Sequence, residues 1–325
     1  MGGSGFRLWG VKNLLELYQT RASVRRFKPE PLRPGDLEKL LLAAQRAPTD
    51  ATAQMYTLLR ITDRELRDRI AQLSDNPHIA HAAEFFLVLA DVYRLRRMLE
   101  FRGGVWGYWP RTAAHFAIAD AVLAGSALAT MAESLGYGIC WIGGVLNHIE
   151  AIGELCGLPE GVFPVAGLCV GVPDEAPAPR PRLRRELVVH ENRYRAYRPE
   201  ELEAAYVDMR PITRSGDWYR VLSRYFAAGG TMERREPPYQ RYVARAGFDP
   251  DLPAEPLKRL QAEGIEAGSL GELIEGALAQ GWGAVRLQPG SAWLEPEPGG
   301  TPRGEDRPGE ALAQALLKAP KPHGL

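Results

Sequence analysis

The chain has 325 residues and a formal net charge of zero, with 40 basic and 40 acidic side chains. Its 45% hydrophobic and 25% charged content is that of a soluble globular protein of roughly two domains, and the neutral balance argues against a general nucleic-acid binder. No apolar run reaches the roughly 18 residues that span a bilayer, and the N-terminus lacks the regions of a signal peptide. We therefore expect no membrane or nucleic-acid partner and a cytoplasmic location.

The cysteine and histidine residues give no indication of a metal or redox site. Cys140, Cys156 and Cys169 form no Cys-x-x-Cys pair and stand in apolar surroundings, so we expect buried free thiols. His78 and His81 have no further ligand residues at metal-binding spacing. We predict no metal.

In the first part of the chain, helical and strand patterns alternate. Helices are predicted at 9–20, 36–47 and 64–73, and strands at 56–62 and 85–90. The strand at 85–90 is a continuous apolar run, which is typical of a central strand. Residues 48–54, Pro-Thr-Asp-Ala-Thr-Ala-Gln, form a polar loop of hydrogen-bonding side chains.

The middle of the chain begins with residues 94–112, which we predict to be irregular. Their aromatic residues Trp106, Tyr108 and Trp109 fit either a lid over a pocket or a surface loop that packs its own rings. The remaining predicted elements are a hydrophobic Ala-rich helix at 112–135 that Gly136 ends, strands at 138–142 and 165–170, and a helix capped by Asn147 that runs to Leu155.

The last third of the chain is expected to contain separate modules. A Pro- and Ala-rich connector at 173–182 leads to helices at 199–208, 218–228 and 236–246, with a basic loop at 210–217. We place one domain at 1–249 and a small α/β accessory module at 250–295, with helices at 255–263 and 269–280 and a hairpin at 282–294. Residues 296–325 read as a flexible tail rich in Pro, Gly and charge, apart from a helix at 309–318.

Residues Arg21–Phe27 carry the most informative local pattern. Arg21, Ser23 and Arg25 stand at every second position, so in an extended segment these three polar side chains leave one face, and we expect Val24 and Phe27 to anchor the segment in a core. Two guanidinium groups around a hydroxyl make a compact anion site that suits a phosphate. The spacing alone fits a solvated basic turn equally well.

Three further features are candidate parts of a binding site. They are the polar loop 48–54, the strand end Trp141-Ile-Gly-Gly144, and Arg180-Pro-Arg182. Paired glycines at a strand end let a flat ligand approach the backbone, although an ordinary tight turn has the same sequence. Pro181 stiffens the arginines beside it for a second phosphate contact, or the segment is a solvated linker. Gly136-Tyr-Gly138 follows a helix and lacks the third glycine of a dinucleotide-binding fingerprint, so we reject that motif.

Taken together and in this order, these features resemble the nitroreductase-like FMN flavoproteins, most closely the NADPH-preferring nitroreductases and flavin reductases. The resemblance covers residues 9–248. Its pieces are Arg21-Ala-Ser-Val-Arg-Arg-Phe27, Leu59-Arg-Ile-Thr-Asp63, Ala82-Ala-Glu-Phe85, Glu133-Ser-Leu-Gly136, Ile142-Gly-Gly144, Gly167-Leu-Cys-Val-Gly171, Arg180-Pro-Arg-Leu183 and Val189-His-Glu-Asn192.

The resemblance implies an α+β fold with a central, mostly antiparallel sheet wrapped by helices, and an intertwined homodimer with two FMN sites at the subunit interface. By position, it assigns the FMN phosphate to Arg21, Ser23, Arg25, Arg180 and Arg182. It assigns the ribityl chain and ring to Thr49, Asp50, Gln54, Asn76 and the backbone of Ile142, Gly143 and Gly144. Arg210 and Arg214 match positions that hold the 2′-phosphate of NADPH.

The implied activity is hydride transfer from NADPH through FMN N5 to a small acceptor, such as a nitroaromatic, a quinone, a flavin or a metal oxyanion, with ping-pong kinetics. The flavin supplies the chemistry, so no catalytic side chain is expected. Alternatives are specialised flavin chemistry, such as dehalogenation or flavin fragmentation, and a regulatory flavin binder whose C-terminal extension holds a partner. The chain departs from the family in carrying Ala22 beside the phosphate arginines and Asp50 in the polar loop.

Overall fold

The computed structural model describes residues 13–104, 106–107, 109–212 and 216–248, and the strands at 282–288 and 291–296. The helices are α1 Leu14–Thr20, α2 Asp36–Gln45, α3 Arg64–Ser74, α4 Tyr93–Phe101, α5 Pro110–Ser134, α6 Ile149–Leu155, α7 Pro199–Met209, α8 Trp218–Phe226 and α9 Thr231–Val243. The strands are β1 Tyr56–Arg60, β2 Glu84–Asp91, β3 Gly138–Ile142, β4 Val162–Gly171, β5 Trp282–Gln288 and β6 Ser291–Pro296.

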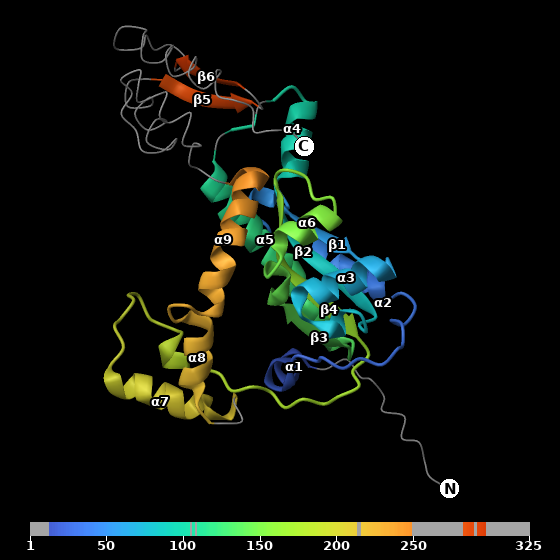
Figure 1. Ribbon diagram of the computed structural model, residues 1–325, viewed down its shortest axis with the longest axis vertical. Helices are drawn as coiled ribbons and strands as arrows, with labels where there is room; N and C mark the ends of the chain where they lie inside the picture. Colours follow the sequence, from blue (N-terminus) through green and yellow to red (C-terminus); the bar gives the residue numbers. More distant parts are fainter. Residues whose placement is uncertain are drawn as a thin grey trace.

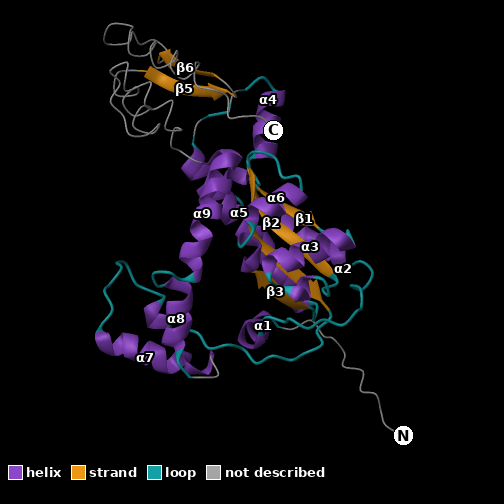
Figure 2. Cartoon of the chain, in the orientation of Figure 1, coloured by secondary structure: helices purple, strands orange, loops and turns teal. Residues whose placement is uncertain are grey.

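A four-stranded antiparallel sheet in the order β1-β2-β4-β3 forms the centre of the molecule (Figure 2). The register pairs Tyr56 with Ala90, Glu84 with Val170, and Gly138 with Gly171. Every residue of β2 is buried, as its continuous apolar sequence predicts. The expectation of an antiparallel sheet covered by helices is confirmed.

Helices cover both faces of this sheet. On one face, α2 and α5 pack against Phe86 and Val88 of β2, and on the other face α3 and α6 pack against Phe85 and Leu87. The buried side of α5 is lined by small residues, so the helix lies close to the strands; a Cβ at Gly125 would lie 2.5 Å from the Trp141 ring. By length and composition α5 passes as a membrane span, yet its apolar side forms part of this core.

Asp36 fastens the start of α2 to the end of α5. Its buried carboxylate accepts hydrogen bonds from Tyr137 Oη at 2.7 Å, Arg33 Nε at 2.8 Å and Lys39 Nζ at 2.8 Å. Burial raises the pKa of Asp36, but these hydrogen bonds outweigh it and lower the pKa to about 2. The carboxylate is therefore charged at neutral pH.

Two sequence-based predictions in the middle of the chain are wrong. Residues 93–101 form α4 instead of an irregular segment, because Glu100 pairs with Arg96 and Arg97 one helical turn before it. Asn147 does not cap α6: His148 precedes that helix, and Asn147 ends the 3₁₀ turn η3 Gly143–Leu146.

The rings of Trp106 and Trp109 lie 5.0 Å apart and pack against the core cluster that contains Ala113, Ile149 and Phe163. This packing favours the packed loop over the lid.

The C-terminal part of the described chain forms an arm. In Figure 1, α7 and α8 stand apart from the sheet, and α9 leads back to α6. Helix α9 begins before the predicted 236 and accommodates Pro237 and Pro238 in its interior. The hairpin expected at 282–294 is present as β5 and β6, whereas the helices expected at 255–263, 269–280 and 309–318 lie outside the described residues, as do residues 9–12.

Candidate functional site

The segment Arg21–Phe27 lies along the edge strand β3. The Val24 N–H donates to Ile139 O at 2.9 Å, and both Val24 and Phe27 are buried. A Cβ at Gly138 would lie 2.7 Å from the Val24 side chain, so the glycine permits this close approach. The prediction that Val24 and Phe27 anchor this segment in the core is confirmed.

Arginines from two distant parts of the chain lie in the neighbourhood of Cys140 in β3. Burial raises the pKa of Cys140, and the positive charges of Arg25 and Arg180 oppose that rise, which places both guanidinium groups in the neighbourhood of one thiol. Arg21 is held through Nε by Glu133 of α5 at 3.2 Å. Arg182 is exposed and donates to the carbonyl oxygens of Arg180 and Pro181.

His78 and Glu175 also belong to this charged cluster. The Glu175 carboxylate accepts the backbone N–H groups of Arg25 at 2.5 Å and Arg26 at 3.0 Å, which lowers its pKa. Burial, and then the charge of Arg25, lower the pKa of His78, and His78 Nε2 is a buried atom without a hydrogen-bond partner in the described structure. Neither residue was expected here, because only the folding of the chain brings them to Arg25.

The other end of β3 forms an exposed backbone turn. Gly143 is exposed, and a Cβ at this position would meet no atom within 4 Å. Gly144 is buried, and a Cβ there would lie 2.2 Å from both Asn76 Nδ2 and Ser74 O. The structure thus brings Asn76 together with the turn that follows Ile142.

The polar loop 48–54 is held in a strained conformation by a buried carboxylate. Ala51, Thr52 and Gln54 have φ of 46°, 55° and 54°, in the left-handed region that is costly for residues other than glycine. Asp120 of α5, which is 1% exposed, accepts the N–H groups of Asp50 and Met55, each at 2.9 Å. Asp120 was missed in the sequence, where an isolated acid in an Ala-rich helix was the available signal.

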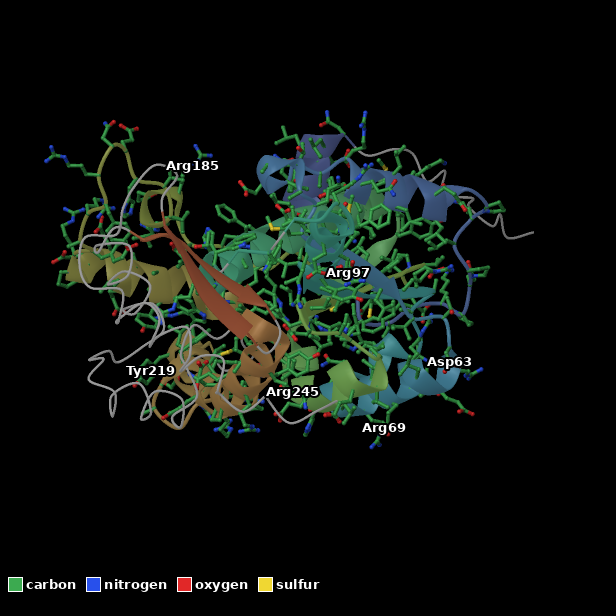
Figure 3. All side chains as sticks on the ribbon, turned by 90° about the horizontal axis from the view of Figure 1, so that it is seen from above. Asp63, Arg69, Arg97, Arg185, Tyr219 and Arg245 are labelled. Carbon is green, nitrogen blue, oxygen red and sulfur yellow. The ribbon has the colours of Figure 1, made fainter. Side chains whose placement is uncertain are left out.

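Within one chain, the loop 48–54 lies far from the arginine cluster. The loop precedes β1, whose first residue Tyr56 is opposite Ala90, whereas Arg25 is near the first residues of β3, at the opposite end and the opposite edge of the sheet. Arg210 lies at the end of α7 on the arm. In Figure 3 this arm, marked by Arg185 and Tyr219, lies on the opposite side of the view from Asp63 and Arg69 of the α3 region. Arg214 lies outside the described residues.

Comparison with known proteins identifies the family. The model of the Nitroreductase family matches residues 18–172. The oxygen-insensitive NADPH nitroreductase of Salmonella typhimurium is 34% identical over 224 residues, which cover 68% of this chain and 86% of that protein. The chain belongs to the nitroreductase family. The Cr(VI) reductase of Pseudomonas sp. is a second relative, 33% identical over 243 residues. These residues cover 72% of this chain and 98% of that protein.

Solved structures of the nitroreductase family share the fold. The NADPH:FMN oxidoreductase from Vibrio harveyi complexed with NAD⁺ has a TM-score of 0.63 at 26% identity, covering 73% of this chain and 98% of that one. Nitroreductase A from Vibrio parahaemolyticus has a TM-score of 0.65, also at 26% identity, covering 72% and 97%. The predicted family and its α+β fold are therefore confirmed.

Proposed function

We propose that this protein is an FMN-dependent oxidoreductase that transfers reducing equivalents from NADPH to a small-molecule acceptor such as a nitroaromatic, a quinone or a flavin. The family membership and the names of the relatives, an NADPH nitroreductase and an NADPH:FMN oxidoreductase, support this activity. The observation that carries it is the arrangement along β3, with Arg25 and Arg180 near its start and the exposed Gly143 turn at its end.

The charged cluster fits the phosphate of FMN. Arg25 and Arg180 provide two guanidinium forks from opposite parts of the chain, and the unpartnered His78 Nε2 near Arg25 adds a group that a phosphate oxygen would satisfy. We assign Arg21, Ser23, Arg25, Arg180 and Arg182 to this group. Glu175 fixes the backbone of the segment through two amides and so positions the arginine side chains.

The turn at the other end of β3 fits the flavin ring. The open face of Gly143 exposes backbone to a flat ligand, while Asn76 stands beside Gly144. We assign the ring contacts to the backbone of Ile142, Gly143 and Gly144 and to the Asn76 amide. Bound here, FMN would supply two-electron chemistry, with a hydride taken from NADPH and an equivalent hydride delivered to the acceptor, whose second proton comes from solvent. Arg210 and Arg214 remain our proposal for the NADPH 2′-phosphate.

We also propose a homodimer in which the partner's loop 48–54 completes the site, because the loop cannot reach the arginine cluster of its own chain. Thr49, Asp50 and Gln54 would then contact the ribityl chain or ring bound by the other subunit. Large apolar side chains are exposed on several elements that such a partner would cover: Leu14, Leu15, Tyr18, Val122, Leu123, Leu202, Val207 and Tyr219. We expect a solution mass of twice the 35.9 kDa chain mass by light scattering, and a flavin-containing monomer would contradict the shared site.

The proposed function predicts a yellow protein that NADPH bleaches without oxygen. The purified chain should show the visible absorbance of oxidised FMN, lose it on anaerobic addition of NADPH and regain it on addition of a nitroaromatic or quinone. Steady-state kinetics should be ping-pong, with parallel double-reciprocal lines, because NADPH and the acceptor use one face in turn. A yellow protein that NADPH does not bleach would instead be a non-catalytic flavin binder, and a colourless protein that binds no added FMN would overturn the flavin assignment.

A further inference from the structure

Three arginines, two of α9 and one of the π-helical turn η6 Ala244–Phe248 that follows it, reach across to α6 and the turn before it. Arg241 contacts Glu150 at 3.2 and 3.0 Å, and Arg245, labelled in Figure 3, contacts Glu154 at 3.2 Å. The third contact differs in charge, because Arg235 Nε donates to the neutral amide oxygen of Asn147 at 2.8 Å. In the described part of the chain no carboxylate lies within 4.0 Å of the Arg235 guanidinium. Among the described residues the charge of Arg235 therefore has no acidic partner, whereas Arg241 and Arg245 are each paired with a glutamate.

This charge lies at the turn that ends β3. The Asn147 backbone N–H donates to Gly144 O at 2.9 Å, and Asn147 Nδ2 donates to Ser74 O at 3.3 Å. The residue that holds Arg235 is thus part of the same turn that exposes Gly143. Arg235 itself is half-buried. Only its Nε is engaged by described residues, so the two terminal nitrogens of its planar fork are available to a ligand.

Helix packing fixes Arg235 in this place. A Cβ at Gly153 of α6 would lie 2.1 Å from Tyr242 Oη, and Tyr242 of α9 is 4% exposed, so the two helices are in direct contact. The ion pairs of Arg241 and Arg245 lie on the same contact, C-terminal to Arg235. A cation that is held in position before a ligand arrives loses little conformational entropy on binding.

We propose that Arg235 gives the site a preference for anionic electron acceptors, such as nitroaromatic or quinone compounds that carry a carboxylate or sulfonate, by binding the anionic group beside Gly143. The inference rests on the proposed function, because it takes the Gly143 turn as the place where the acceptor meets the flavin. The phosphates of NADPH are a second source of the same anionic chemistry, and the experiment separates the two.

The test compares 4-nitrobenzoate with 4-nitrobenzamide, which have nearly the same shape but differ in charge, as acceptors of the flavin-loaded enzyme. In Arg235→Gln, kcat/KM for the benzoate should fall about tenfold relative to the benzamide, since a charge-assisted hydrogen bond contributes about 1.5 kcal/mol or more. The loss should appear mainly in KM for the benzoate. Arg235→Lys keeps the positive charge but not the planar guanidinium group, so its kcat/KM for the benzoate relative to the benzamide should fall by less.

Two further variants isolate the charge. Arg241→Gln removes an arginine of α9 whose charge Glu150 already compensates, so the benzoate-to-benzamide ratio should stay at the wild-type value. Asn147→Asp gives Arg235 the acidic partner that the other two arginines have, and it should lower the ratio although Arg235 is intact. Flavin content and thermal unfolding show that each variant is folded and loaded.

A wild-type ratio of kcat/KM for the benzoate to kcat/KM for the benzamide, in flavin-loaded Arg235→Gln or in flavin-loaded Asn147→Asp, would overturn the proposal. A higher KM for NADPH with an unchanged acceptor ratio would assign Arg235 to the dinucleotide and would also overturn it. Failure of the proposed function would already be seen in the wild-type protein, as absent flavin or absent bleaching by NADPH, before any variant is compared.

Discussion

Replacement of Gly144 by alanine is expected to destabilise the protein by about 3 kcal/mol, the upper part of the usual range for overpacking a core. The new Cβ would lie 2.2 Å from Ser74 O and from Asn76 Nδ2. Because the first of these atoms belongs to the backbone at the end of α3, a side-chain rotation cannot relieve the contact. The melting temperature should fall by roughly 5 °C, measured by circular dichroism on the flavin-free protein.

The neighbouring glycine provides the matched control. A Cβ at Gly143 would meet nothing within 4 Å, so Gly143→Ala should unfold at nearly the wild-type temperature. Its methyl group would instead occupy the face that we assign to the flavin ring, and FMN content should fall. Equal melting temperatures for the two variants would contradict the packing argument, and full flavin content in Gly143→Ala would contradict the assignment of the ring.

The Arg25→Ala variant is expected to lose FMN. Arg25 is one of the two guanidinium groups near Cys140, and loss of a charge-assisted hydrogen bond to a phosphate weakens binding by roughly tenfold or more. Flavin released by denaturation of the purified variant, together with titration by added FMN, measures the effect. The backbone N–H of residue 25 remains available to Glu175, so the segment should keep its place.

Arg26→Ala is the control for this prediction. The Arg26 guanidinium is turned toward Asp174 O at 3.0 Å and the Glu175 carboxylate at 3.8 Å, and its side chain is 69% exposed. Its removal should leave FMN content at the wild-type level. If Arg25→Ala retains full flavin occupancy, or if both variants lose it equally, the phosphate assignment of Arg25 is wrong.

The errors in the predicted elements have local and tertiary causes. Helix α4 was missed because it was taken together with the stretch 101–109, which aromatic and glycine residues dominate, although the spacing of Glu100 from Arg96 and Arg97 is helical. Asparagine is a residue type that often caps helices, but the Asn147 side chain instead forms hydrogen bonds with Ser74 O and Arg235 Nε. No periodicity reveals such partners, because they come from other elements.

The candidate site was predictable only in part for the same reason. The alternation in Arg21–Phe27 is a local pattern, and the burial of Val24 opposite the polar residues follows from it. Phe27 stands two residues after Arg25, so its burial depends on core packing instead of alternation. The roles of His78, Glu175 and Asp120 do not, since each acts on a residue that is distant in the sequence. The assignment of residues to FMN and NADPH remains a proposal, as do the domain boundaries and the cytoplasmic location.

By itself, the sequence determined the family, the central buried strand, the long Ala-rich helix and the free thiols, because apolar periodicity and short motifs are properties of neighbouring residues. The tertiary structure alone decided that Arg25 and Arg180 both lie in the neighbourhood of Cys140, that loop 48–54 lies at the other end of the sheet from them, and that Arg235 stands beside the Gly143 turn with no acidic partner among the described residues. Those outcomes depend on strand register and helix packing, which set the distances between residues that are far apart in the chain.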